Sequence, residues 1–462
     1  MKKGFIFFVS LAALISCQTK LEQADSLRLE NNFDEAFTLY EEAAKEGDAK
    51  AMWRLARALG NGDGTDFDNA KAFEWLKKAA DKGCEEAKCD LACTYLYGWY
   101  AQDKNVEKGE SMLKDLEKKS HNSYVLSRLA REYIYGWTFE ENKEKAERLL
   151  NSVEDKNEPS YLRVMAEISL LGGKKIQIDY NEAIKYLTKA FEKGSTSSAR
   201  VLGNIFINGY QDTKKENNIS KDITKAIEWY EKGIDANNTD CLCALAYIVF
   251  SEDSIVAEYH NVNKGIELLN SAVTHGSAEA MNQLGLCYRF GEFVNKDDEK
   301  AKKLFKASYD LHDAEGAFNY GLIFTEGENR DIKKAIDIWK KAVEYGSAGA
   351  ANNLYCYYDC GDYGAKTHLD KEKAKKYLKE AARLGNVVGM RNISREYFYG
   401  NNLFEKDEKQ AFIYAKKSAD LGDVDACQYV AYFYDNAIGC NKDPIEAQKY
   451  RDKITPEKKE NK

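Results

Sequence analysis

A charged, alanine-rich motif recurs along almost the whole chain and constrains its fold more than any other feature. Each copy ends at a glycine or a polar residue, and these closing residues are Gly47, Gly83, Ser120, Asn157, Gly194, Asn237, Gly276, His312, Gly346, Gly385 and Gly422. Self-similarity at a period of about 20–50 residues is typical of repeat proteins, in which each unit packs on its neighbours. A chain of 462 residues can therefore fold as an array of units instead of around one large core.

The residues before each closing residue predict an amphipathic helix. A small residue stands eleven positions earlier, and the series is Ala36, Ala72, Gly109, Ala146, Ala183, Ala226, Gly265, Ala301, Ala335, Ala374 and Ala411. Large apolar residues follow three and four positions later, and a second small residue often follows at seven. These offsets lie on one face of a helix. We therefore predict that Trp75, Trp229 and Trp339, which occupy the apolar positions, belong to the core.

A second pattern predicts another helix before each of these. Its clearest copy is Ala280, Leu284, Gly285, Tyr288 and Gly291, at offsets that again share one helical face, with the last glycine as the helix stop. Only three prolines occur in the chain, as expected for mostly uninterrupted helix. The fold class is therefore all-α, built from about eleven helix pairs.

The loop between the two helices of a pair is longer than in a tetratricopeptide repeat, whose unit has about 34 residues and a short turn. Most copies have 10 or 11 residues from the loop glycine to the next small residue. Segments 49–83 and 278–308 are similar to the Sel-like repeat family (SLR), a relative of the tetratricopeptides, and the resemblance covers roughly residues 24 to 454. It implies a right-handed α/α superhelical solenoid, with the first helix of each pair on a concave face that binds other proteins.

The N-terminus carries a separate signal. Two lysines precede an apolar run that is too short to span a membrane, which takes about 20 residues. The run ends in Leu14-Ile15-Ser16-Cys17, which resembles a bacterial lipobox and implies cleavage before Cys17 and lipidation of that residue. In such lipoproteins Gln18 favours the outer membrane, on either its periplasmic or its surface side, if the host has two membranes. A plain signal peptide and a buried first helix are the alternatives.

These patterns divide the chain into four parts. We expect a lipoprotein signal peptide over 1–16, N-terminal capping helices over 17–48, Sel-like repeats over 49–454 and a disordered tail over 455–462. The longest polar loop, 211–224, is the best candidate for a joint or an insertion.

The sequence contains no H-E-x-x-H, no G-x-S-x-G and no phosphate-binding G-x-x-x-x-G-K-[ST] motif. The spacing of Cys84, Cys89 and Cys93, with no histidine nearby, does not fit a zinc site. The net charge is −8 and no basic stripe stands out, which argues against nucleic acid as a partner. We therefore expect no catalytic residue, no metal and no cofactor.

Three aromatic residues are candidate binding residues. Trp99, Trp137 and Tyr210 each follow the loop glycine by one residue, where they could anchor a partner peptide or stack on a sugar. They could also merely cover the end of the core. Two functions remain: a membrane-anchored scaffold for protein–protein interactions in the cell envelope, or a glycan- or cell-wall-associated accessory protein that uses these aromatics. An enzyme is the least favoured reading.

Overall fold

A computed structural model describes residues 18–171, 178–210, 218–251, 256–327, 330–361, 369–400 and 403–454. Throughout these ranges the regular structure is helical, apart from an isolated antiparallel bridge between Tyr210 and Ile219, so the predicted all-α fold is confirmed. The predicted signal peptide, the lipidation site Cys17, the tail 455–462 and the first half of the long polar loop, 211–217, lie outside the described residues.

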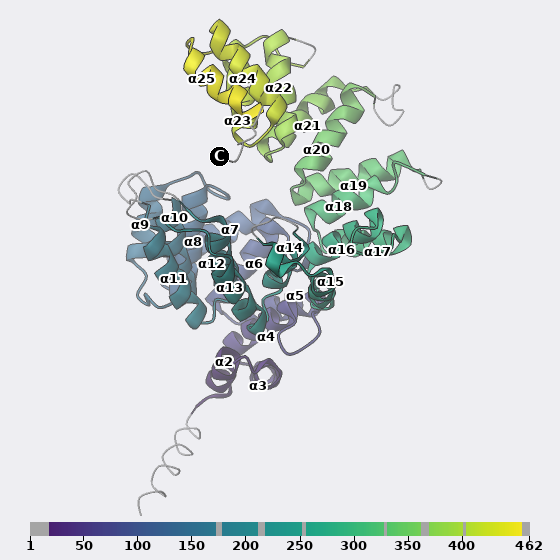
Figure 1. The fold of residues 1–462 in the computed structure, drawn as a ribbon. Coiled ribbons are helices and arrows are strands. Elements are labelled where there is room, and N and C mark those ends of the chain that lie inside the picture. Colours follow the sequence, from purple (N-terminus) through teal and green to yellow (C-terminus); the bar gives the residue numbers. More distant parts are fainter. Residues whose placement is uncertain are drawn as a thin grey trace, which may run out of the picture. The chain divides into compact units, whose positions relative to one another are not determined.

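The chain forms two compact units whose boundary lies within α16 (Ala278–Phe290). The first unit comprises residues 1–284 and 291–295, and the second comprises 285–290 and 296–462. The helices of the first unit are α2 (Lys20–Leu29), α3 (Phe33–Glu46), α4 (Ala49–Asn61), α5 (Asn69–Asp81), α6 (Glu85–Tyr97), α7 (Val106–Lys119), α8 (Ser123–Tyr135), α9 (Lys143–Asn151), α10 (Pro159–Leu171), α11 (Tyr180–Glu192), α12 (Ser197–Asn208), α13 (Ile223–Asp235), α14 (Thr239–Phe250) and α15 (Val262–Thr274), with 3-10 turns η1 (Trp99–Ala101) and η2 (Ala257–Tyr259). Those of the second unit are α17 (Asp298–Asp310), α18 (Ala314–Leu322), α19 (Ile332–Tyr345), α20 (Ala348–Asp359), α21 (Lys371–Arg383), α22 (Val387–Tyr399), α23 (Glu408–Asp420), α24 (Val424–Asn436) and α25 (Pro444–Ile454) (Figure 1).

Polar side chains fix where the second helix of each pair begins. An Asp or Asn side chain accepts a hydrogen bond from the backbone N–H three residues further on, which satisfies a donor that the helix leaves free. The residues that do so are Asp68, Asn105, Asn142, Asp179, Asp222, Asn261, Asp297, Asp331, Asp370 and Asp407. The start of these ten second helices is thus encoded locally, whereas Asn32 before α3 makes no such hydrogen bond.

The closing residues end these helices largely as their pattern predicts. The closing glycines have positive φ angles, and so do Asn237, with φ of 56°, and His312, with φ of 62°. Ser120 differs, because it ends α7 in an extended conformation with φ of −85°. Its hydroxyl donates a hydrogen bond to the Glu85 carboxylate instead. Asn157 is an exception, because α9 already ends at Asn151, so its position was predicted wrongly. The other closing residues lie at helix ends, in conformations of two kinds.

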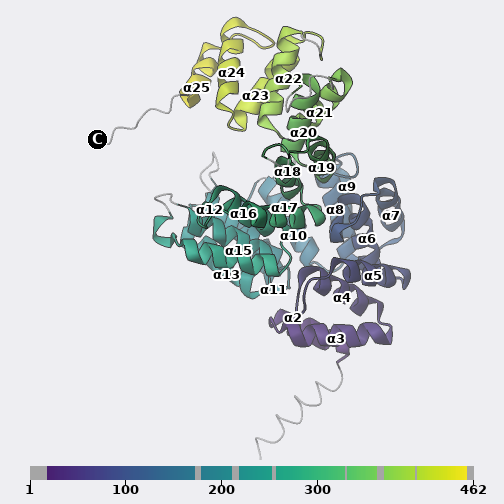
Figure 2. The same cartoon turned by 90° about the vertical axis from the view of Figure 1, so that its right-hand side faces the viewer.

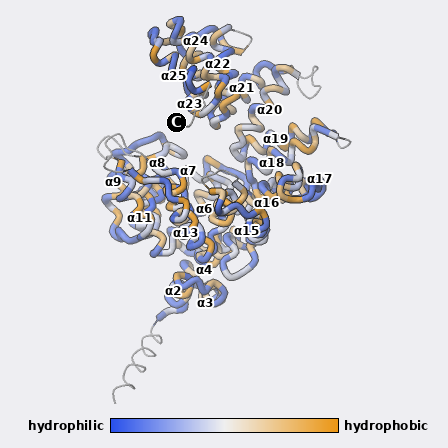
Figure 3. Tube along the Cα trace, viewed as in Figure 1, coloured by the Kyte–Doolittle hydropathy of each residue, from blue (hydrophilic) through white to orange (hydrophobic). Residues whose placement is uncertain are grey.

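The apolar faces form the core between helices, so hydrophobic and hydrophilic residues alternate along the trace (Figure 3). Trp339 is fully buried, as predicted, at the offset of four from its small residue. Trp75 and Trp229, at the offset of three, are only half-buried, which corrects the prediction. Lysine ammonium groups lie over their rings, 4.3 Å from the ring centroid of Trp75 and 4.4 Å from that of Trp229. In α19 the fourth position therefore lies in the core, whereas in α5 and α13 the third position lies at its edge.

The first unit curls until its N-terminal helices contact later repeats of the same unit. The guanidinium of Arg28 in α2 donates a hydrogen bond to the Gly194 carbonyl before α12, over 3.3 Å. The Asn237 amide, between α13 and α14, donates to the Asp63 carboxylate over 2.7 Å and to the Gly62 carbonyl over 3.2 Å. Figures 1 and 2 show the purple start of the chain beside the teal helices of this unit. One turn of the superhelix is therefore closed by contacts between distant repeats.

Within the described ranges, none of the helices combines the length and the apolar character needed to cross a lipid bilayer.

Candidate functional site

A cavity of about 880 Å³ lies inside this closed turn. Its walls come mainly from α4, α6, α8 and α10, which are the first helices of successive pairs, and α2, α3 and the loop before α12 complete it. Cavities of roughly 300–1,000 Å³ are the size that binds small molecules or parts of larger ligands. The first helices thus form the recessed face of the first unit, as the sequence predicted.

The cavity concentrates positive charge in a chain that is acidic as a whole. Its lining contains eight basic residues, which are Arg28, Lys50, Arg54, Arg57, Arg128, Arg131, Arg163 and Lys193. It contains five acidic residues, which are Asp63, Glu86, Asp90, Asp155 and Glu158. The lining therefore has a local excess of positive charge, whereas the chain carries a net charge of −8.

Most of these basic groups have protein partners. Arg54 pairs with Asp25 over 2.9 Å, and Arg131 pairs with Glu167 over 2.8 Å. The Arg163 guanidinium donates to the Ser197 hydroxyl over 2.7 Å. These contacts hold three of the arginines against the wall.

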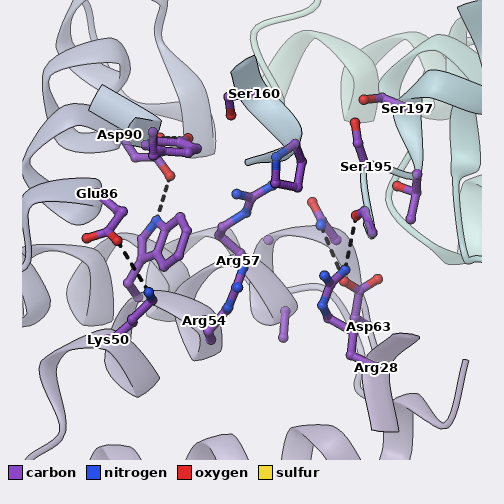
Figure 4. A pocket seen from close by; sticks show the side chains of 18 of the residues that line it. Arg28, Lys50, Arg54, Arg57, Asp63, Glu86, Asp90, Ser160, Ser195 and Ser197 are labelled. Carbon is purple, nitrogen blue, oxygen red and sulfur yellow. Dashed lines mark hydrogen bonds and ion pairs between the residues drawn. The ribbon is translucent and has the colours of Figure 1, made fainter. Parts of the chain in front are cut away.

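Arg57 differs from the other arginines. No residue in the described part of the chain forms a hydrogen bond or an ion pair with it. It lies 5.3 Å from the centroid of the Trp53 ring, and, against the effect of burial, the charges of Asp90 and Asp63 act on it from a longer range and raise its pKa. Figure 4 shows its side chain in the middle of the cavity, with Asp90 on one side and Arg28 on the other. Its guanidinium is therefore available to a ligand.

A buried carboxylate holds the platform under Arg57. Asp90, which is 3% exposed, accepts hydrogen bonds from the Trp53 indole N–H over 2.8 Å and from the Tyr124 hydroxyl over 2.5 Å. The Trp53 and Tyr124 rings also meet edge to face, with centroids 5.4 Å apart. Three first helices, α4, α6 and α8, are joined by this network, which fixes the Trp53 ring beside which Arg57 lies.

Helix N-termini add to the positive potential, because the unpaired N–H groups there carry partial positive charge. The starts of α8, α10 and α12 all lie in the cavity lining. The Glu158 carboxylate caps α10 by accepting from the N–H groups of Ser160 and Tyr161. At α12 the capping residue Thr196 makes no side-chain hydrogen bond to the helix. This end of α12 thus lacks a side-chain acceptor for its N–H groups.

Burial penalises uncompensated charges in this region. It lowers the pKa of the Arg28 and Arg163 guanidinium groups, and the nearby charge of Arg54 lowers that of Arg28 further. Burial also raises the pKa of the Asp63 and Glu158 carboxyls. An anion bound among the arginines would offset part of the cost of burying the charges of Arg28 and Arg163.

The buried Asp63 carboxyl makes closure of the first unit pH-dependent. Because its pKa is raised in the folded chain, folding favours the protonated form, and that stabilisation is lost as the pH rises through the folded-state pKa. We expect Asp63→Asn to increase the free energy of unfolding at pH 7, because the amide oxygen still accepts from Asn237 without a buried charge. The gain should shrink as the pH falls toward 4. Urea unfolding at both pH values measures it, and the exposed Asp115→Asn variant is the control; a gain that does not depend on pH would contradict the assignment.

The structure separates the three aromatic residues that the sequence singled out. Trp99 lines the cavity and is 37% exposed, with the Arg128 guanidinium 5.3 Å from its ring centroid. Trp137 is 52% exposed, and the Arg131 guanidinium lies 5.0 Å from its ring centroid. The two tryptophans therefore contact neighbouring turns of the same helix, α8.

Tyr210 lies elsewhere. It is half-buried and stacks on Tyr180, with ring centroids 4.5 Å apart, and it forms the isolated backbone bridge with Ile219. Its surroundings agree with the alternative reading of these aromatics, in which the ring covers the end of the core.

The arginines of the cavity were missed by the sequence reading, although a signal for them exists. In α4, Arg54 and Arg57 follow the first small residue, Ala51, by three and six positions, and the equivalent positions of α8 hold Arg128 and Arg131. These offsets point away from the core face of the first helices. Because each helix contributes only one or two arginines, they form no basic run in the sequence.

In the described part of the chain, no group of three or more histidine, cysteine, aspartate or glutamate residues is arranged to hold a metal ion. Cys84, Cys89 and Cys93 are buried free thiols.

A family model described as the Sel1 repeat matches most of the chain, in ten segments. They are residues 25–48, 49–84, 85–114, 163–195, 202–238, 278–313, 314–347, 349–386, 387–423 and 424–450.

Among characterised proteins, the chitin synthase regulator SKT5 of Saccharomyces cerevisiae is 29% identical over 204 residues, which are 41% of this chain and 29% of that protein. Chitin synthase regulatory factor 1 of Schizosaccharomyces pombe is 29% identical over 124 residues, which are 26% of each protein. The matched segments thus span less than a third of either yeast protein.

Solved structures are similar in fold. A protective antigen of uropathogenic Escherichia coli strains, which displays an SLR fold, is 21% identical and aligns over 90% of this chain and 86% of its own, with a TM-score of 0.39. A Sel1 repeat protein from Oxalobacter formigenes is 19% identical over 67% of this chain and 86% of its own, with a TM-score of 0.42.

Proposed function

We propose that this chain, which belongs to the Sel1 repeat family, acts in the cell envelope as a lipid-anchored scaffold that binds other proteins. The observation that carries the proposal is the basic cavity that the first helices form in the first unit. A solenoid binds partners through extended surfaces of this kind. The proposal includes no catalytic step.

The anchor is the part of the proposal that rests on the sequence alone. Leu14-Ile15-Ser16-Cys17 supports lipidation of Cys17, and Gln18 supports the outer membrane. Several acyl chains on one residue hold a protein stably at a membrane, whereas one chain does so only marginally. In a bacterial host, Cys17→Ser should abolish labelling by a palmitate analogue and release the chain from the membrane fraction; continued labelling would contradict the anchor.

Site-specific cross-linking tests the scaffold role. A photo-crosslinking amino acid in place of Ser160, at the cavity, should capture a defined partner in intact cells. The same amino acid in place of Lys185, which is exposed on the second helix α11, is the matched control. Capture at both positions alike, or at neither under several growth conditions, would count against the scaffold role.

The second candidate function is that of a glycan- or cell-wall-associated accessory protein. It is favoured by the exposure of Trp99 and Trp137. If Trp137 stacks on a sugar, soluble cell-wall glycan fragments should quench the tryptophan fluorescence, and Trp137→Phe should remove most of that response. Trp229→Phe, which alters a half-buried tryptophan, is the control. An unchanged fluorescence in the unsubstituted chain would eliminate this function.

A further inference from the structure

We infer that the cavity of the first unit binds an acidic peptide segment and that Arg57 receives one of its carboxylates. The inference rests on the proposed scaffold role and names the chemistry of the partner. It starts from the arrangement around Arg57 and is independent of the lipid anchor.

Arg57 is a buried charge without a directly bonded anion among the described residues: burial disfavours it, and the charges of Asp90 and Asp63 attract it and raise its pKa without forming a hydrogen bond or ion pair with it. No ion pair or hydrogen bond reaches it from the described residues, and the like charges of Arg28 and Arg54 lie close enough to repel one another. The buried Nε atoms of Arg28 and Arg128 also make no hydrogen bond within the described chain. Buried guanidinium groups are costly unless an anion pairs with them. A carboxylate is well suited, because it accepts two parallel hydrogen bonds from one guanidinium.

The rest of the lining fits a peptide better than a small inorganic anion. A bare anion would occupy only the space next to the guanidinium groups, whereas the cavity extends over about 880 Å³. Its wall carries hydroxyl and amide groups that can pair with a peptide backbone, and these belong to Asn61, Asn69, Ser123, Ser160, Ser195 and Thr196. The rings of Trp99 and Tyr100 offer apolar contact for side chains.

The acidic residues of the lining limit how much negative charge the ligand can carry. Glu86, Asp90 and Glu158 lie among the arginines and would repel a dense polyanion such as a nucleic acid. One or two carboxylates, spaced along an uncharged backbone, can meet Arg57 with less repulsion from these groups than a dense polyanion would meet. The charge pattern therefore favours a short acidic peptide.

Fluorescence anisotropy on the whole purified chain tests this inference. The probe is fluorescein-labelled Gly-Ser-Glu-Ala-Glu-Gly with an amidated C-terminus, and the matched peptide has Gln at both Glu positions. The acidic peptide should bind at least about tenfold more tightly than the Gln peptide, because charged hydrogen bonds are lost in the latter. Arg57→Gln should weaken binding of the acidic peptide about tenfold, and Arg57→Lys should weaken it less.

Arg391→Gln is the matched control. Arg391 lies in the second unit on α22, the first helix of its pair, and forms an ion pair with Asp423. This substitution should leave peptide binding unchanged. Arg57→Gln should remain folded, as circular dichroism can check, since it removes both the repulsion from Arg28 and the attraction to Asp90 and Asp63. Equal affinity for the two peptides, or equal affinity of the unsubstituted and Arg57→Gln chains, would overturn the inference. So would displacement of the peptide by an equal concentration of inorganic phosphate, which would reveal a small-anion site.

The two proposals fail in different ways. If the cross-linker in place of Ser160 captures a partner but the acidic peptide does not bind, the scaffold role stands and the peptide inference falls. If the peptide binds with the expected dependence on Arg57 but no partner is captured, the scaffold role falls.

Discussion

Trp339→Ala should lower the free energy of unfolding of the second unit by about 3–5 kcal/mol, the usual cost of removing a fully buried tryptophan. The indole is 0% exposed and its N–H donates to the Phe318 carbonyl over 3.2 Å. It packs so closely on α18 that a Cβ at Gly321 would lie 2.4 Å from the indole nitrogen. The surrounding helices cannot fill the space that alanine would leave without moving apart.

Hydrogen exchange followed by mass spectrometry measures where this loss is felt. Each repeat contacts mainly its neighbours, so exchange should accelerate most in α18 to α21, and much less in α4 to α8. Tyr399→Ala, which removes an aromatic side chain that is 58% exposed on α22, should change the stability by under about 0.5 kcal/mol. Equal acceleration in all helices would show that the chain unfolds as one cooperative body.

Asp90→Ala should destabilise the first unit by about 3 kcal/mol, because it removes two hydrogen bonds to a charged acceptor at once. The Trp53 indole N–H and the Tyr124 hydroxyl would both be left without their buried acceptor. Chemical denaturation monitored by circular dichroism measures the loss.

Tyr124→Phe serves as the comparison, since it removes one donor and leaves the carboxylate bonded to Trp53. Its cost should be about 1 to 2 kcal/mol. If both variants cost the same, the Asp90–Trp53 hydrogen bond contributes little, and the platform beneath Arg57 would be held by ring packing instead.

The helices were predictable from the sequence because their signals are local. The closing residues, the small residues eleven positions earlier and the polar caps such as Asp297 each act within one turn or one pair. The burial of Trp339 follows from the same spacing. The half-burial of Trp75 does not, because an offset of three is still on the apolar face but lies at its edge.

The cavity was not predictable, because it depends on how much each repeat rotates relative to the previous one. That rotation is small and its sum decides which distant repeats meet. The contact of Asn237 with Asp63 joins residues 174 positions apart, and nothing in either local pattern encodes it. The arginines lay at readable offsets, but only closure brings Arg28 and Arg57 into one space.

The sequence singled out aromatic positions and no charged ones. The position one residue after the loop glycine marked Trp99, which the structure places in the cavity lining, and Trp137, which it leaves exposed. The same position marked Tyr210, whose ring is stacked on Tyr180. Whether Trp99 and Trp137 bind a partner stays a prediction.

The hydrogen bonds that Asn237 donates to the turn at Gly62 and Asp63 have a thermodynamic consequence for any ligand of the cavity. A ligand that touches both α4 and the start of α12 makes its full set of contacts only while this turn is closed. Closure and binding are then linked equilibria, and each must strengthen the other by the same factor. A substitution of Asn237, which does not line the cavity, would therefore alter the affinity of the cavity without removing a single contact to the ligand.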